Sequence, residues 1–81
     1  MDDNQILHRI GELVAEEHDL RGRVQRGELD SDLEQARLRT LEEALDQCWD
    51  LLRRRRAARG SGADPDATGP RPVDEVERYL Q

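Results

Sequence analysis

Two amphipathic segments joined by a very short connection set the fold of this chain. Over residues 3–26 and again over 31–59, apolar residues recur every three or four positions, which is the spacing of a helix that buries one face. The first segment carries Ile6, Ile10, Leu13, Leu20 and Val24, and the second carries Leu38, Leu41, Leu45, Cys48 and Leu52. Because only residues 27–30 separate the segments, the two helices must lie side by side. The sequence therefore predicts an all-α fold in which residues 1–60 form an antiparallel, coiled-coil-like hairpin.

Residues that favour helix ends lie where the apolar pattern begins and stops. Asp2 with Gln5, and Ser31 with Glu34, have the spacing of a capping box, in which side chains satisfy backbone N–H groups of the first turn. Gly27 follows the first segment and can adopt the left-handed conformation that ends a helix. These signals agree with the helix bounds that the apolar pattern indicates.

Folding the chain about this turn brings together positions whose numbers sum to about 58. The seams then pair Ile6 with Leu52, Ile10 with Cys48, Leu13 with Leu45, and Leu20 with Leu38. Glu17 is the charged member of the first seam and would face Leu41. We expect its carboxylate to turn toward solvent and to pair with Arg21 one helical turn later.

The composition leaves too little apolar mass for a thick core. The chain has 81 residues, of which 35% are hydrophobic and 40% charged, with no Phe, one Trp and one Tyr. Domains of this size depend on disulfides, a metal, oligomerisation or close helix packing, and a single cysteine permits no disulfide within one chain. Since two helices bury only their facing seams, we expect a homo-oligomer in which two hairpins dimerise into a four-helix bundle.

Three apolar residues are predicted to form an exposed strip on one flank of the hairpin. Leu7, Val14 and Trp49 each fall one position after a seam residue, and the antiparallel pairing brings these flanks together. A strip of this kind needs a cover, for which aromatic residues are frequent anchors. The cover is a second copy of the chain, the chain's own C-terminal tail, or a different protein.

The C-terminal quarter of the chain divides into two parts. Residues 61–72 are rich in Gly, Pro, Asp and small side chains, which predicts a flexible linker. In residues 73–81, Val76, Tyr79 and Leu80 have the i, i+3 and i+4 spacing of an apolar helix face. We therefore expect a short C-terminal helix that docks through these three side chains.

The densest local charge is a run of four arginines near the end of the second helix: Arg53, Arg54, Arg55 and Arg56. Positive charge there complements the helix dipole, and the antiparallel register places the last two arginines beside Asp3 and Asp2. The alternative is that the run contacts an acidic partner or nucleic acid. A net charge of −6 disfavours direct nucleic-acid binding, so such a contact would be made within a nucleoprotein complex.

The sequence carries no pattern typical of a catalytic, cofactor or metal site. Cys48 occupies a seam position, where a small buried side chain is expected. His8 and His18 are ten positions apart on outward faces, without the spacing of a ligand pair. We therefore expect no enzyme activity, cofactor, metal or small-molecule substrate. Because no signal peptide or membrane-spanning stretch is recognisable, the sequence predicts a cytoplasmic protein without membrane contact.

Two blocks of the sequence, LDQCWDLLR at residues 45–53 and VERYLQ at residues 76–81, are similar to a family of short actinobacterial proteins. That family is known only as a domain of unknown function. The resemblance covers nearly the whole chain and implies an actinobacterial, cytoplasmic helical hairpin without adding a mechanism. From the residues we expect a non-enzymatic protein-protein interaction or scaffold module. The alternative is an accessory factor of a nucleoprotein machine, the ribosome or RNA polymerase, bound through the four arginines.

Overall fold

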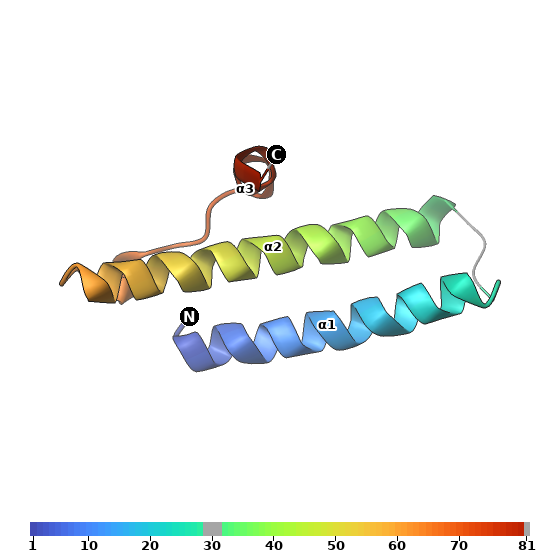
Figure 1. Ribbon diagram of the computed structural model, residues 1–81, viewed down its shortest axis with the longest axis horizontal. Coiled ribbons are helices and arrows are strands. Elements are labelled where there is room, and N and C mark those ends of the chain that lie inside the picture. The colour runs from blue at the N-terminus through green and yellow to red at the C-terminus, as the bar shows by residue number, and fades with distance from the viewer. Residues whose placement is uncertain (29–31, 81) are drawn as a thin grey trace.

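The computed structural model describes residues 1–28 and 32–80, and the elements within those ranges are all helical. They are α1 (Asp3–Gln25), α2 (Asp32–Gly60), the short 3-10 helix η1 (Pro65–Ala67) and α3 (Val73–Leu80). Helices α1 and α2 run side by side in opposite directions, and α3 lies on the side of α2 that faces away from α1 (Figure 1). The principal extents are 50 × 25 × 15 Å. The predicted all-α class is confirmed.

Local capping explains where α1 begins and ends. The Asp2 side chain accepts a hydrogen bond from the Gln5 backbone N–H at 2.8 Å, and the Asp2 N–H donates to the Gln5 side chain at 2.8 Å. This is the predicted capping box. At the other end Gly27 has a φ of 73°, and its N–H donates to the Val24 carbonyl, so the expected glycine stop is also confirmed. The capping box expected at Ser31 lies outside the described residues.

The hairpin core consists of two clusters that follow the predicted seams. One cluster contains the buried residues Ile6, Ile10, Leu51 and Leu52, and the other contains Leu13, Leu20 and Leu41; Leu45 and Cys48 pack against both. An ion pair between Asp3 and Arg55, 2.8 Å long, fixes the register at the open end of the hairpin. Glu17 pairs with Arg21 at 2.8 Å, as expected, but its side chain is only 13% exposed instead of turned to solvent. Arg21 also reaches Glu42 at 2.5 Å.

The segment that the composition predicts to be a flexible linker lies along α2 in the structure. Side chains of α2 donate hydrogen bonds to its carbonyl groups: Arg55 to Pro65 at 2.9 Å, Arg54 to Gly69 at 2.9 Å, and Gln47 to Arg71 at 2.7 Å. These donors satisfy backbone acceptors that the segment's own irregular conformation leaves open. The path of the chain from α2 to α3 is therefore set by side chains of α2.

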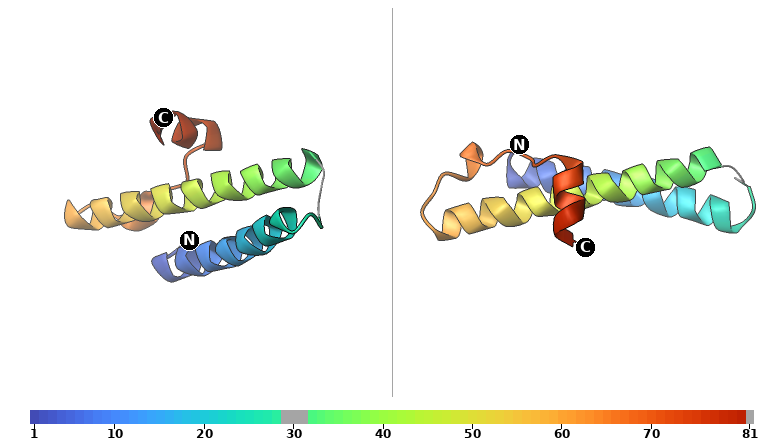
Figure 2. Two further views of the ribbon diagram at one scale, coloured as in Figure 1. Left: turned by 45° about the vertical axis from the view of Figure 1, so that its right-hand side comes forward. Right: turned by 90° about the horizontal axis from the view of Figure 1, so that it is seen from above.

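Helix α3 crosses α2 instead of running along it (Figure 2). Its contact residue is Val76, which is 1% exposed, whereas Tyr79 is 77% exposed and Leu80 is 51% exposed. Of the three predicted docking side chains, Val76 is buried within this chain, whereas docking of Tyr79 and Leu80 on a second copy or a partner stays a prediction. A helix of eight residues that crosses its neighbour touches it over about one turn, so the rest of its apolar face stays in solvent.

Shortening Val76 to alanine should release α3 while leaving the hairpin folded. The change removes two buried methyl groups, at roughly 0.8 kcal/mol each, which weakens docking by a factor of about 15. Amide hydrogen exchange over residues 73–80 should accelerate accordingly, with unchanged exchange in α1. Leu80→Ala is the matched control, because Leu80 is exposed; equal acceleration in both variants would contradict docking through Val76.

Candidate functional site

The predicted apolar strip is exposed in the structure. Leu7 is 42% exposed, Val14 is 37% exposed and Trp49 is 40% exposed. In the register set by the Asp3–Arg55 pair, Trp49 lies level with a point between Leu7 and Val14. These fractions remain exposed with α3 packed on the opposite side of α2 from α1 (Figure 1).

The four arginines do not form one continuous surface. Arg55 is buried, with 4% exposure; it donates to Asp3 at 2.8 Å, to Asp66 at 3.1 Å and to the Pro65 carbonyl at 2.9 Å. The expected pairing of Arg55 with Asp3 is therefore present, and a side chain so deeply buried offers little surface for the alternative contact with an outside partner. The reason is that it occupies a seam-facing position whose charge is matched within the chain. Together Arg59 and Arg55 lower the pKa of Asp3 to about 2 through hydrogen bonds.

The other three arginines differ in their surroundings. Arg54 is half-buried and points toward the tail, where it donates to the Gly69 carbonyl. Arg53 and Arg56 are exposed and form no ion pair within residues 1–28 and 32–80. The expected pairing of Arg56 with Asp2 is likewise absent from these ranges, so Arg53 and Arg56 are the members of the arginine run that keep an unpaired charge there.

Asp50 is the charged residue that sequence reasoning missed. It is 4% exposed and holds the tail through Arg71, whose Nε donates to its Oδ2 at 3.1 Å and whose Nη2 donates to its Oδ1. Arg54 adds a weaker contact at 3.4 Å. The hydrogen bond from Arg71, followed by that from Arg54, lowers the pKa of Asp50 against the opposing effect of burial. The sequence contained one signal for this contact. Arg71 is the sole basic residue between Arg59 and Arg78, which makes it a candidate partner for an acidic residue of the helix.

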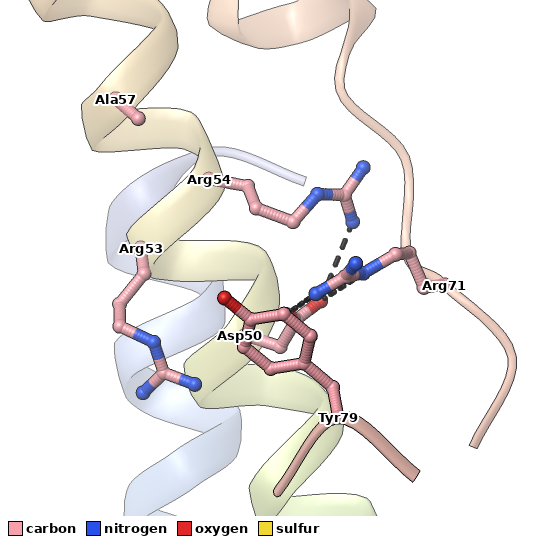
Figure 3. A pocket seen from close by; sticks show the side chains of 6 residues that line it. All are labelled: Asp50, Arg53, Arg54, Ala57, Arg71 and Tyr79. Atoms are coloured by element: carbon pink, nitrogen blue, oxygen red, sulfur yellow. Dashed lines mark hydrogen bonds and ion pairs between the residues drawn. The ribbon is translucent and has the colours of Figure 1, made fainter. Parts of the chain in front are cut away.

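A hollow of about 400 Å³ opens between α2 and the tail beside Asp50. Its lining residues are Asp50, Arg53, Arg54, Ala57, Arg71 and Tyr79, and Figure 3 shows them in place. We call it the arginine hollow. The Arg71 guanidinium lies 5.4 Å from the centre of the Tyr79 ring, a cation–π distance. The lining carries three guanidinium groups and one carboxylate, and Glu75 adds a second carboxylate 3.8 Å from the Arg71 guanidinium, so the positive charges remain in excess.

Two carboxyl groups meet where α3 packs on α2. The Oε2 atom of Glu77 is buried and accepts no hydrogen bond, and the Asp46 carboxyl group faces it. A hydrogen bond between the two acids, which exists only when one is protonated, raises the pKa of Glu77, and burial and the charges of Asp46 and Glu43 add to this effect. The α2·α3 contact therefore brings like charges together at any pH at which both carboxyl groups are ionised.

The cysteine and the two histidines do not combine into a metal site in the described part of the chain. Cys48 is half-buried in the hairpin, and burial raises the pKa of its thiol, which disfavours the reactive thiolate. The His8 and His18 side chains are 80% and 78% exposed and lie near Glu12 and Glu17. In the part of the chain that the structure describes, no three His, Cys, Asp or Glu side chains are arranged to hold a metal ion. Nor does any helix there have the length and apolar content to cross a bilayer.

The fold and these surfaces define a class of small all-helical proteins, in which an antiparallel hairpin carries a short third helix across its outer face. Within that class, the chain belongs to the family described as "Protein of unknown function (DUF2630)", whose model matches residues 2–81. This confirms the resemblance drawn from the sequence.

Similar proteins occur in mycobacteria, which are actinobacteria. One is the uncharacterized protein Rv0898c of Mycobacterium tuberculosis strain H37Rv, and another is the uncharacterized protein Mb0922c of Mycobacterium bovis. Each is 49% identical over 77 residues, which cover 95% of this chain and 88% of the relative. No solved structure matches the chain.

Proposed function

We propose that this protein is a non-enzymatic interaction module of the cytoplasm that self-associates through the strip of Leu7, Val14 and Trp49. Two hairpins would then form a four-helix bundle. The observation that carries the proposal is the grouping of these large apolar side chains on one uncovered flank, in a chain of which 40% is charged. Contiguous apolar surface on a highly charged protein is typical of an interface.

The charges around Trp49 favour a second copy of the chain as the partner. Glu42 lies seven residues before Trp49 and Arg56 lies seven residues after it, so the three side chains share one stripe of α2. When two α2 helices cross in antiparallel fashion at Trp49, Glu42 of each copy faces Arg56 of the other. The stripe is therefore complementary to itself about a two-fold axis. Arg56 has no ion pair within the described residues that would compete, whereas Glu42 pairs with Arg21 and would share its carboxylate between the two arginines in the dimer.

Trp49→Ala should shift the protein from dimer to monomer. Loss of an aromatic anchor costs at least 2 kcal/mol at an interface, which weakens dimerisation by about 30-fold or more. Sedimentation equilibrium should show a mass of twice 9.3 kDa for the natural chain. The apparent mass of the variant should fall toward that of the monomer as the protein is diluted. Leu33→Ala is the control, because Leu33 is 80% exposed and lies outside the strip.

Charge reversal tests the proposed arrangement within the same experiment. Glu42→Arg and Arg56→Glu should each weaken the dimer, and the double variant should regain part of the loss. A natural chain that stays monomeric at high concentration, or a dimer indifferent to Trp49→Ala, would contradict the proposal.

The alternative, attachment to a nucleoprotein machine through the arginine run, has less support. Arg55 is buried in ion pairs, and Arg54 is directed to the tail. Only Arg53 and Arg56 of the run are exposed, which is a small basic surface for a partner that binds through phosphate contacts.

A further inference from the structure

The arginine hollow is a local positively charged surface on a protein whose net charge is negative. The chain carries a net charge of −6, yet Arg53, Arg54 and Arg71 line one hollow with Asp50 as its acidic member. Asp50 is buried, and its carboxylate is paired with the guanidinium groups of Arg71 and Arg54. The guanidinium of Arg53 is left without an ionic partner in the described part of the chain.

Two side chains of the hollow, those of Arg71 and Arg54, are held in place by contacts within the chain before any ligand arrives. Arg71 is held by Asp50, and Arg54 is held by the Gly69 carbonyl at 2.9 Å. Ala57 lies one helical turn after Arg53 on the same face of α2 (Figure 3). Its side chain is a single methyl group, which leaves this part of the hollow open. Such pre-positioning lowers the entropy lost on binding.

Tyr79 supplies a planar surface at the edge of this hollow. Its ring lies over the Arg71 guanidinium, and its hydroxyl points toward the turn of α2 that carries Arg53 and Ala57 (Figure 3). The side chain remains 77% exposed. An exposed ring backed by a guanidinium is a surface on which a flat heterocycle stacks.

We propose that the arginine hollow binds a phosphate monoester attached to a planar ring, of which a nucleoside monophosphate is the simplest example. A phosphate monoester carries a charge of about −1.5 to −2 at neutral pH, opposite in sign to the excess charge of the hollow. Guanidinium groups bind phosphate oxygens through paired hydrogen bonds. The volume of about 400 Å³ lies within the range of small-molecule sites, roughly 300 to 1,000 Å³.

This inference departs from the sequence-based expectation of no small-molecule ligand. The departure has a structural cause, because Arg71 and Tyr79 reach the arginines of α2 only after the tail has packed against that helix. It also concerns other side chains than the proposed dimer, since none of Leu7, Val14 and Trp49 lines the hollow. Either proposal can therefore fail without the other.

Titration of the full-length protein with adenosine monophosphate, followed by heteronuclear NMR, tests the proposal. We expect saturable shifts at the Arg53 and Arg54 side chains and at Tyr79, and weaker binding at higher ionic strength. Arg53→Gln should weaken binding by about tenfold or more, because a charged hydrogen-bond donor is lost. The matched control is Arg39→Gln, an exposed arginine of α2 outside the hollow, which should bind as the natural chain does.

The ring and the phosphate are tested separately with adenosine and inorganic phosphate. Tyr79→Leu should weaken binding of the nucleotide by about fivefold or more, with phosphate binding unchanged. Absence of saturable binding up to about 10 mM nucleotide, or equal losses in Arg39→Gln and Arg53→Gln, would overturn the site. Equal affinity for phosphate and nucleotide would overturn the part of the proposal that concerns the ring.

Discussion

Leu52→Ala is expected to leave most of the hairpin unfolded at room temperature. Leu52 is 1% exposed and packs in the cluster that also contains Ile6, Ile10 and Leu51. Replacing a buried leucine with alanine costs about 2 to 5 kcal/mol, through lost apolar burial and the cavity that remains. A single core in a domain of this size supplies about 3 to 5 kcal/mol. One substitution therefore removes most of the available stability.

Urea titration followed by far-ultraviolet circular dichroism measures this effect. The control is Leu33→Ala, because Leu33 is 80% exposed and surface changes of this kind alter stability by about 0.5 kcal/mol or less. Both variants should be measured at several protein concentrations, since self-association adds stability that depends on concentration. A loss below 1 kcal/mol for Leu52→Ala would mean that the hairpin core lies elsewhere.

The hairpin could be predicted from the sequence because its information is local and repeated. Each seam places an apolar residue every three or four positions over several turns, and the glycine stop fixes where the chain reverses. The short connection then leaves one way for the seams to meet. The pairing of Asp3 with Arg55 satisfies the same numerical register as the core, so charge and apolar pattern agree.

The position of the tail could not be predicted because it depends on contacts between residues far apart in the sequence. Glycine and proline in residues 61–72 identify a segment without regular structure, but they say nothing about donors on another helix. Asp50 lies on the polar face of α2, where a solvated side chain is the ordinary outcome. Its burial follows from Arg71, 21 residues later, and nothing in the local pattern connects the two.

The same distinction applies to the candidate sites. Leu7, Val14 and Trp49 were identified from helix geometry alone, and the structure leaves them exposed as a flank should be. The apolar spacing of Tyr79 and Leu80 correctly indicates a shared helix face, but spacing does not reveal the crossing angle that decides how much of that face is buried. The arginine hollow exists only where the tail and α2 meet, so the arginine run alone could not indicate it.

Docking of α3 is expected to be strongest at mildly acidic pH, because two carboxyl groups at its contacts titrate in opposite directions. The pKa of Asp50 is lowered in the folded protein, so its contribution is present above its usual pKa and is lost as the pH falls through the lowered value. The pKa of Glu77 is raised, so its contribution is present below its usual pKa and is lost as the pH rises through the raised value. Between the lowered pKa of Asp50 and the raised pKa of Glu77, both contributions favour docking.

Two variants separate the loss of docking at low pH from the loss at higher pH. Docking is measured at each pH as the amide exchange protection of residues 73–80, corrected for intrinsic exchange rates. Asp50→Asn should leave α3 largely undocked across the range, because Arg71 loses the carboxylate that holds the tail. Glu77→Gln should remove the loss at higher pH and raise protection at neutral pH by roughly fivefold, since its amide donates a hydrogen bond to Asp46 without needing a proton.

Asp74→Asn provides the control, because Asp74 lies on the exposed side of the same helix and should leave the profile nearly unchanged. The groups that face Glu77 from α2 are Asp46 and Glu43, both acidic, so no neighbouring cation offsets the repulsion as the pH rises. The tail is held by the Asp50–Arg71 ion pair and destabilised by like charges at Glu77. The fraction of tail that is docked therefore depends on pH. A flat protection profile in the natural chain would show instead that Val76 alone determines docking.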